Sequence, residues 1–96
     1  MGEDIKNIRK YLGFSQCAVS YACGWGTNYI SHIESGEIKN ISFKNAYKIA
    51  FFFLEQLKKK QITANDLEEV IGSSPLLDLI HTLETKNRCD YEFYYS

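Results

Sequence analysis

The sequence predicts an all-α fold of five to six helices, in which a C-terminal helical extension follows a first group of four helices. Apolar residues recur at spacings of three and four along most of the chain, which is the period of a helix with one buried face. Serine, threonine and glycine stand where these runs begin and end, as helix caps do. The expected helices cover residues 4–12, 16–23, 27–34, 42–60, 63–71 and 75–86.

Length and composition agree with one domain. The chain has 96 residues, of which 45% are hydrophobic and 24% are charged, and these values are ordinary for a globular domain. Residues 1–60 form the first predicted unit, and residues 61–96 form the extension, packed on the same domain. The tail at 90–96 is aromatic and alternates weakly, so a short strand or an extended arm is expected there.

The two short helices near the N-terminus are joined by a glycine turn. Ser15 can cap the helix over 16–23, which buries Ala18, Val19 and Ala22 and stops at Gly24. In the helix over 27–34, Ile30 and Ile33 share a buried face. Four short polar residues occupy its outer face: Thr27, Asn28, Ser31 and His32. Two helices of this length around a glycine turn are typical of a helix-turn-helix.

The helices on either side of this pair have clear apolar faces. The first helix ends at Gly13, and its apolar positions are Ile5, Ile8, Tyr11 and Leu12. Ser42 opens the long helix, whose apolar stripe consists of Phe43, Ala46, Tyr47, Ile49, Ala50, Phe53, Leu54 and Leu57. Phe51 and Phe52 widen that stripe, so part of this helix is expected to meet either the C-terminal segment or a second subunit.

The extension contributes the last two expected helices. Thr63 begins the first of them, which has Asp66 in its first turn and stops at Gly72. Ser74 and Pro75 open the second. Its apolar face consists of Leu76, Leu77, Ile80 and Leu83.

The segment over residues 4–54 resembles the lambda-repressor-like, XRE-type helix-turn-helix family of phage and bacterial regulators. The matching positions are Arg9, Gly13, Ser15, Gln16, Ala22, Gly24, Tyr29, Ile30, Ser31, Ile33, Glu34 and Gly36, followed by Ser42, Ala46, Ile49 and Ala50. Val19, Ser20 and the run from Gly24 to Gly26 depart from the family pattern. The resemblance implies a regulator that binds double-stranded DNA, expected to be a dimeric repressor. It also implies that Arg9 and Glu34 form a structural ion pair and that Gly36 adopts a left-handed turn.

A helix of this kind enters the major groove with its N-terminal residues at the base edges. Asn28 is the best candidate base reader, because its amide can pair with adenine. Thr27, Ser31 and His32 are further candidates; His32 could donate to guanine or approach a phosphate. Candidate contacts to the DNA backbone are Gln16, Ser15, Lys39, Asn40 and Lys44. An equally good interpretation of Ser15 is that it serves only as a helix cap. The alternative for each lysine is that it is a solvated surface charge without a role in binding.

The distribution of charge along the chain gives weak evidence about function. The formal net charge is -1, with six basic against four acidic residues in 1–48 and five against eight in 49–96. This asymmetry suits contact with DNA through one face only. The three cysteines and two histidines have no metal-ligand spacing, and no catalytic motif is present. We therefore expect no enzymatic activity, cofactor or metal, with Cys23 as a small core residue.

No segment is apolar enough for a membrane span and the first residues are acidic, so a cytoplasmic protein is expected. The main alternative function is a protein-binding module of the same fold, such as an antitoxin, an adaptor or an inhibitor, with or without autoregulation through DNA. Its partner could bind the C-terminal extension. Trp25 is expected either to cover the core or to contact the DNA backbone or a partner subunit.

Overall fold

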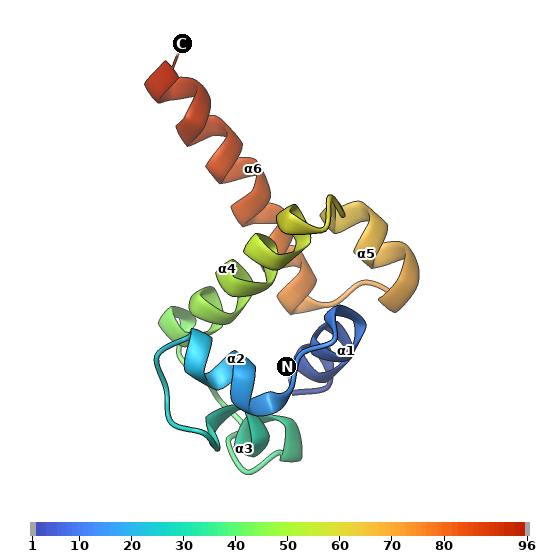
Figure 1. Cartoon of the computed structure of the whole chain (residues 1–96), viewed down its shortest axis with the longest axis vertical. Coiled ribbons are helices and arrows are strands. Elements are labelled where there is room, and N and C mark those ends of the chain that lie inside the picture. Colours follow the sequence, from blue (N-terminus) through green and yellow to red (C-terminus); the bar gives the residue numbers. More distant parts are fainter. Residues whose placement is uncertain (1, 96) are drawn as a thin grey trace.

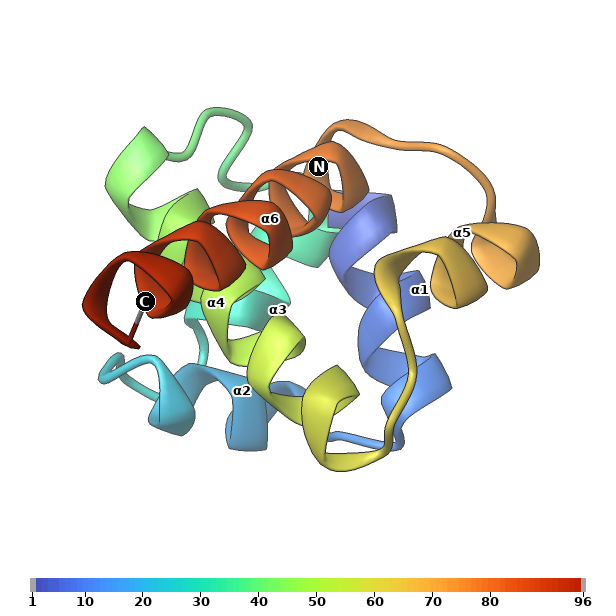
Figure 2. The same cartoon turned by 90° about the horizontal axis from the view of Figure 1, so that it is seen from above.

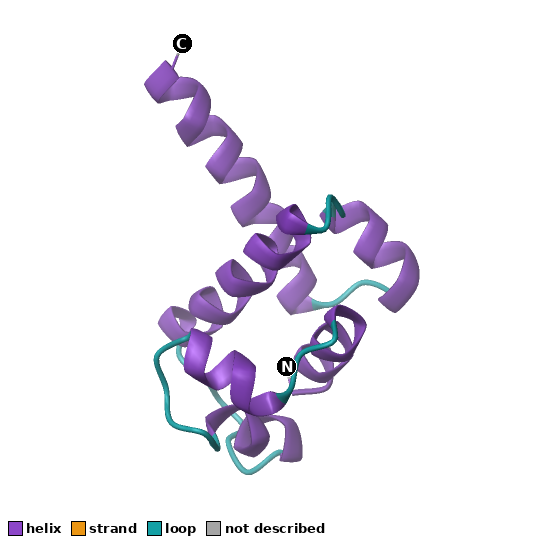
Figure 3. Ribbon diagram, viewed as in Figure 1, coloured by secondary structure: helices purple, strands orange, loops and turns teal. Residues whose placement is uncertain are grey.

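The structure is a computed structural model that describes the backbone of residues 2–95 and the side chains of residues 2–86. Six helices make up the fold (Figure 1): α1 (Gly2–Leu12), α2 (Gln16–Ala22), α3 (Tyr29–Ser35), α4 (Phe43–Lys59), α5 (Ala64–Ile71) and α6 (Pro75–Tyr95). The described part of the chain contains no strand, and its helices are connected by short loops (Figure 3). The expected all-α class is confirmed.

Local capping explains where the helices begin and end. The hydroxyls of Ser15, Ser42 and Thr63 each accept a hydrogen bond from a backbone N–H in the first turn of α2, α4 and α5. At the end of α3, Gly36 has φ 89°, the left-handed conformation that a side chain would strain. These caps are the ones that the sequence predicts.

One hydrophobic core joins all six helices. α4 lies at its centre and packs against α1, α2 and α6, and α6 also contacts α1 and α5 (Figure 2). Phe53 is the largest fully buried side chain. The core cluster that contains Ile5 and Ile8 of α1 also contains residues of α5 and α6: Leu67, Leu76, Leu77, Ile80 and Leu83. The extension therefore completes the core of the helix-turn-helix unit.

The chain is elongated because α6 extends beyond the other helices. The principal extents are 45 × 27 × 21 Å. In Figure 1, α3 lies at one end of the long axis and the end of α6 at the other. The N-terminal turn of α1 lies against the end of α3, where a Cβ built on Gly2 would come 2.5 Å from the Ile33 carbonyl oxygen. Only glycine fits there without a shift of the backbone.

The tail prediction is wrong. Neither a strand nor an extended arm forms at 90–95, because α6 continues to Tyr95 instead of ending near Lys86, and Ser96 lies outside the described residues. No proline or glycine follows Pro75, so nothing in the sequence interrupts the helix. The weak alternation of aromatic residues was an insufficient strand signal in so short a segment.

Three predicted positions on apolar helix faces are also wrong. Tyr11, expected on the apolar face of the first helix, is 41% exposed. Ala22 is exposed, because the last turn of α2 directs Val19, Ser20 and Cys23 inward instead. Phe43, expected in the apolar stripe, is 73% exposed because it is the first residue of α4 and precedes the turn in which that helix meets the core. The rest of the stripe is buried or partly buried as expected.

Candidate nucleic-acid interface

The outer surface of α3 and its flanking turns contains most of the residues predicted to contact DNA. α2 packs across α3, with Val19 of α2 and Ile30 and Ile33 of α3 in the core. The buried hydroxyl of Ser20 accepts a hydrogen bond from the backbone N–H of Ile30 at 3.2 Å. This bond satisfies a donor in the first turn of α3 and ties that turn to α2.

Thr27 and Asn28 precede α3 instead of lying within it, so the predicted helix start at Thr27 is two residues early. Asn28 is the N-cap residue, but it has an αR backbone and its side chain caps nothing. Its Oδ1 accepts a hydrogen bond from the Thr27 hydroxyl at 3.4 Å, and both residues are exposed. Ser20 supplies the acceptor that the Asn28 Oδ1 would provide as a cap. Within residues 2–86 the Asn28 amide nitrogen donates no side-chain hydrogen bond, so it can donate to an external partner.

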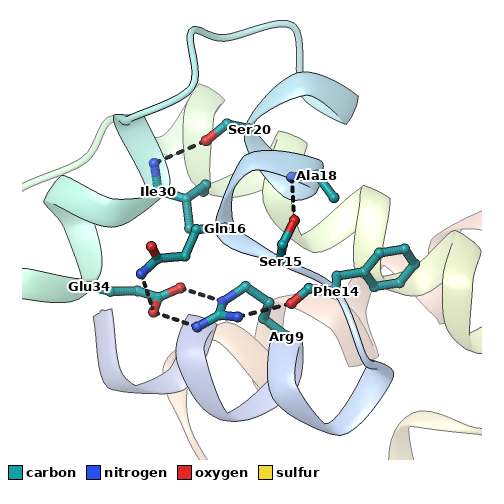
Figure 4. A network of polar contacts seen from close by, with 8 residues as sticks. All are labelled: Arg9, Phe14, Ser15, Gln16, Ala18, Ser20, Ile30 and Glu34. Carbon is teal, nitrogen blue, oxygen red and sulfur yellow. Dashed lines mark hydrogen bonds and ion pairs between the residues drawn. The ribbon is translucent and has the colours of Figure 1, made fainter.

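A buried ion pair connects α1 to α3 (Figure 4). Arg9 donates through Nε to Glu34 Oε2 at 2.8 Å and through Nη2 to Glu34 Oε1 at 3.0 Å. Its Nη1 donates to the Phe14 carbonyl oxygen at 2.9 Å. The two side chains are 11% and 5% exposed. This bidentate geometry fixes α3 against both α1 and the loop that leads into α2.

Gln16 belongs to the same network. Its Nε2 donates to Glu34 Oε1 at 3.1 Å, so the amide nitrogen expected to reach a phosphate is engaged within the chain (Figure 4). Ser15 is exposed and its Oγ caps α2 by accepting from the Ala18 N–H at 3.1 Å. Because the Ser15 oxygen only accepts in this bond, its hydroxyl proton is free to be donated to another group. The cap role and a backbone contact are therefore compatible for Ser15.

Ser31 and His32 are partly buried on the outer side of α3. The Nδ1 atom of His32 forms an ion-pair contact with Oε2 of Glu37, a residue of the following turn. Glu37 was not among the predicted site residues. It could not be identified from the sequence, because the path of the turn after Gly36 brings it back beside α3.

Lys39, Asn40 and Lys44 are all exposed, in the loop after α3 and at the start of α4. Within residues 2–86, neither lysine forms an ion pair. Both are thus available to phosphates.

A hollow between α1, α2 and α3 is lined by two cations that were not among the predicted site residues. Lys6 and Lys10 of α1 line it together with Ser15, Gln16 and Ser31. Among the side chains that the structure describes, the only carboxylate lining the hollow is that of Glu34, which Arg9 neutralises. The spacing of the two lysines, one helical turn apart, places them on one side of α1, but it does not indicate which helices that side meets.

Trp25 is half-buried and packs against the core in the turn between α2 and α3. Its ring meets that of Tyr29 edge-on at 4.5 Å between centroids, and Lys48 Nζ lies 5.9 Å from the centroid of the indole ring. Asn45 Nδ2 donates to the Tyr29 hydroxyl at 2.8 Å. These contacts attach the first residue of α3 to α4.

The environment of Cys23 indicates a core residue. Its side chain is buried, its Sγ lies 3.8 Å from the Lys48 carbonyl oxygen, and burial raises the pKa of the thiol to about 11. A thiol with this pKa is protonated near neutral pH and is a poor nucleophile. Cys17 is exposed, with its Sγ 3.8 Å from the Thr27 carbonyl oxygen.

Comparison with known proteins gives one match. A family model described as helix-turn-helix matches residues 5–52, half of the chain. No curated protein and no solved structure matches the chain. None of the helices in the described residues is long and apolar enough to cross a membrane. The matched segment runs from α1 into α4 and includes every residue of the Arg9 network and the start of α3.

Proposed function

Because the chain belongs to the lambda-repressor-like, XRE-type helix-turn-helix family, we propose that it is a cytoplasmic, dimeric repressor that binds a specific sequence in double-stranded DNA. The observation that carries the proposal is the exposure of Thr27 and Asn28 at the start of a helix that is held on three sides. Arg9, Ser20 and Asn45 fix α3 to α1, α2 and α4, respectively. A reading element held in this way requires little reorganisation when it binds.

The proposed mechanism assigns the exposed residues to two tasks. The amide of Asn28 pairs with adenine in the major groove, and Thr27 contacts a neighbouring base. Phosphates are bound by Lys39, Asn40 and Lys44 on one side of α3 and by Ser15, Lys6 and Lys10 on the other. Two copies of the chain would read half-sites about one helical turn apart and cover a promoter.

The test is an in vitro selection of bound duplexes from a random pool. The parent chain is compared with the double variant Thr27→Ala/Asn28→Ala, and with a matched control, Asn65→Ala/Thr85→Ala, which changes exposed residues on α5 and α6. The parent and the control should enrich the same inverted repeat, and the site variant should lose the preference. Failure of the parent to enrich any sequence would contradict the proposal.

A second function, binding of a protein partner, is favoured by the exposed aromatic residues. Three aromatic side chains are exposed: Phe43 by 73%, Tyr21 by 66% and Phe51 by 40%. On α4, the ring of Phe51 stacks on that of Tyr47. Such side chains are enriched at protein interfaces. A parent chain that enriches no duplex would favour this function, in the manner of an antitoxin, an adaptor or an inhibitor.

A further inference from the structure

The contact between His32 and Glu37 determines which ring nitrogen of the histidine is available to DNA. Nδ1 of His32 lies against Oε2 of Glu37. These two atoms are 2.5 Å apart, and two lone pairs cannot face each other at this distance, so a proton must lie between them. Because an ionised carboxylate can only accept, the donor of that proton is Nδ1. In a neutral imidazole the other nitrogen, Nε2, then has no proton and can only accept.

The other charged groups near this pair leave the assignment unchanged. On α3 itself, the charge of Glu34 is satisfied by Arg9. In the loop that follows Glu37, Lys39 is exposed and makes no ion pair within residues 2–86. Of the two helices that pack against α3, α2 has no charged side chain and α1 has Glu3, Asp4, Lys6, Arg9 and Lys10. Glu37 is the group that contacts the ring among the described residues.

An acceptor in the major groove discriminates between bases. Adenine presents an N6 amino group and cytosine an N4 amino group, whereas the major-groove edge of guanine offers only acceptors. We propose that Glu37 is a specificity-determining residue that acts through His32: it fixes the Nδ1–H form of the ring, so that Nε2 selects adenine or cytosine and rejects guanine. This inference rests on the proposed function and replaces the expectation that His32 donates to guanine.

The first experiment measures the tautomer without DNA. Long-range ¹H–¹⁵N spectra of the histidine side chains at pH 8.0 distinguish an Nδ1–H ring from an Nε2–H ring. His32 should be in the Nδ1–H form in the parent and in Glu69→Ala, an exposed acid of α5 used as a charge-matched control, and should lose that form in Glu37→Ala. An Nε2–H ring in the parent would overturn the proposal.

The second experiment measures base preference in the selection described above, at the same pH. The relevant operator position is the one whose preference disappears in His32→Ala. The parent and Glu69→Ala should prefer one base pair there over its reversal by roughly fivefold, the worth of one net hydrogen bond, because reversal moves the amino group of adenine or cytosine to the other strand, and Glu37→Ala should reduce that ratio towards one. Removal of Glu37 also removes a negative charge near DNA, so relative enrichments are the measure rather than total affinity.

The outcomes separate the two proposals. An Nε2–H ring in the parent, or equal base preferences in Glu37→Ala and Glu69→Ala, overturns the role of Glu37 and leaves the DNA-binding function intact. A parent that enriches no sequence contradicts the proposed function, and this inference fails with it. The predicted tautomer together with a Glu37-dependent base preference supports both.

Discussion

Arg9 and Glu34 are nearly excluded from solvent, so each side chain depends on the other for its hydrogen bonds. Glu34 accepts from Arg9 twice and from Gln16 once. We expect Glu34→Ala to lower the free energy of unfolding by about 3–5 kcal/mol, because a buried guanidinium would be left without its partner. Urea denaturation followed by circular dichroism measures this change.

The control for this prediction is Glu69→Ala, which removes an exposed carboxylate on α5. Its effect should stay within about 0.5 kcal/mol, as is usual for surface substitutions. Equal losses of stability in the two variants would show that the Arg9–Glu34 pair contributes no more than a surface charge.

Cys23 gives the chain a defined response to alkaline pH. Burial raises the pKa of its thiol from 9.0 to about 11, so between these values the unfolded chain loses the proton while the folded chain keeps it. The stability contributed by the protonated thiol is present below pH 9 and declines as the pH rises from 9 to 11. Parallel denaturation of the parent and of Cys23→Ala should show a steeper decline in the parent, and identical pH profiles would refute the assignment.

At the scale of single helices, the start of α3 is stabilised by a residue that departs from the family pattern. This residue is Ser20, and its hydroxyl accepts the hydrogen bond of the Ile30 N–H, which the Asn28 side chain does not cap. Ser20→Ala should cost about 1 kcal/mol, the usual worth of such a cap. It should also loosen the start of α3, which amide hydrogen exchange at Ile30 would detect.

Ser15→Ala is the comparison for this cap, because it removes a similar hydrogen bond from the start of α2. Its increase in exchange should be confined to α2. If Ser20→Ala leaves exchange at Ile30 unchanged, water satisfies that N–H and the proposed link between α2 and α3 is absent.

The elements were predictable to the extent that local signals determine them. Most helix boundaries could be predicted from the caps at Ser15, Ser42, Thr63 and Gly36, because the hydrogen bonds of a cap depend on a few neighbouring residues. The start of α3 was missed because its donor is satisfied by Ser20, ten residues earlier in the sequence. The contact of Glu37 with His32 likewise depends on a turn whose path the sequence does not specify.

For the whole molecule, a net charge of -1 means that attraction to DNA must come from one face. Lys39 and Lys44 at the α3 end are exposed, as are Lys58, Lys59 and Lys60 at the far end of α4. Lys39→Ala should weaken binding to all sequences and reduce the slope of log K against log salt concentration by about 1. Fluorescence anisotropy with one labelled duplex from 50 to 200 mM salt, roughly the range over which such slopes are resolved, measures it.

Lys58→Ala removes the same charge from the other end of α4 and should leave the slope unchanged. Equal reductions in both variants would mean that DNA responds to total charge, and the assignment of a binding face at α3 would fail. Lys6 and Lys10 were not selected from the sequence for a related reason: their membership of this face follows from the packing of α1 on α3, which periodicity alone does not specify.

The placement of α3 and of the end of α6 at opposite ends of the long axis has a practical consequence (Figure 1). A fluorophore, an affinity handle or a fused protein attached after α6 would stand far from the surface assigned to DNA. The same attachment before α1 would begin beside Ile33 and Glu34, where Gly2 has no room for a side chain. Immobilised through its C-terminal end, the chain would present its reading surface outward to duplexes in solution.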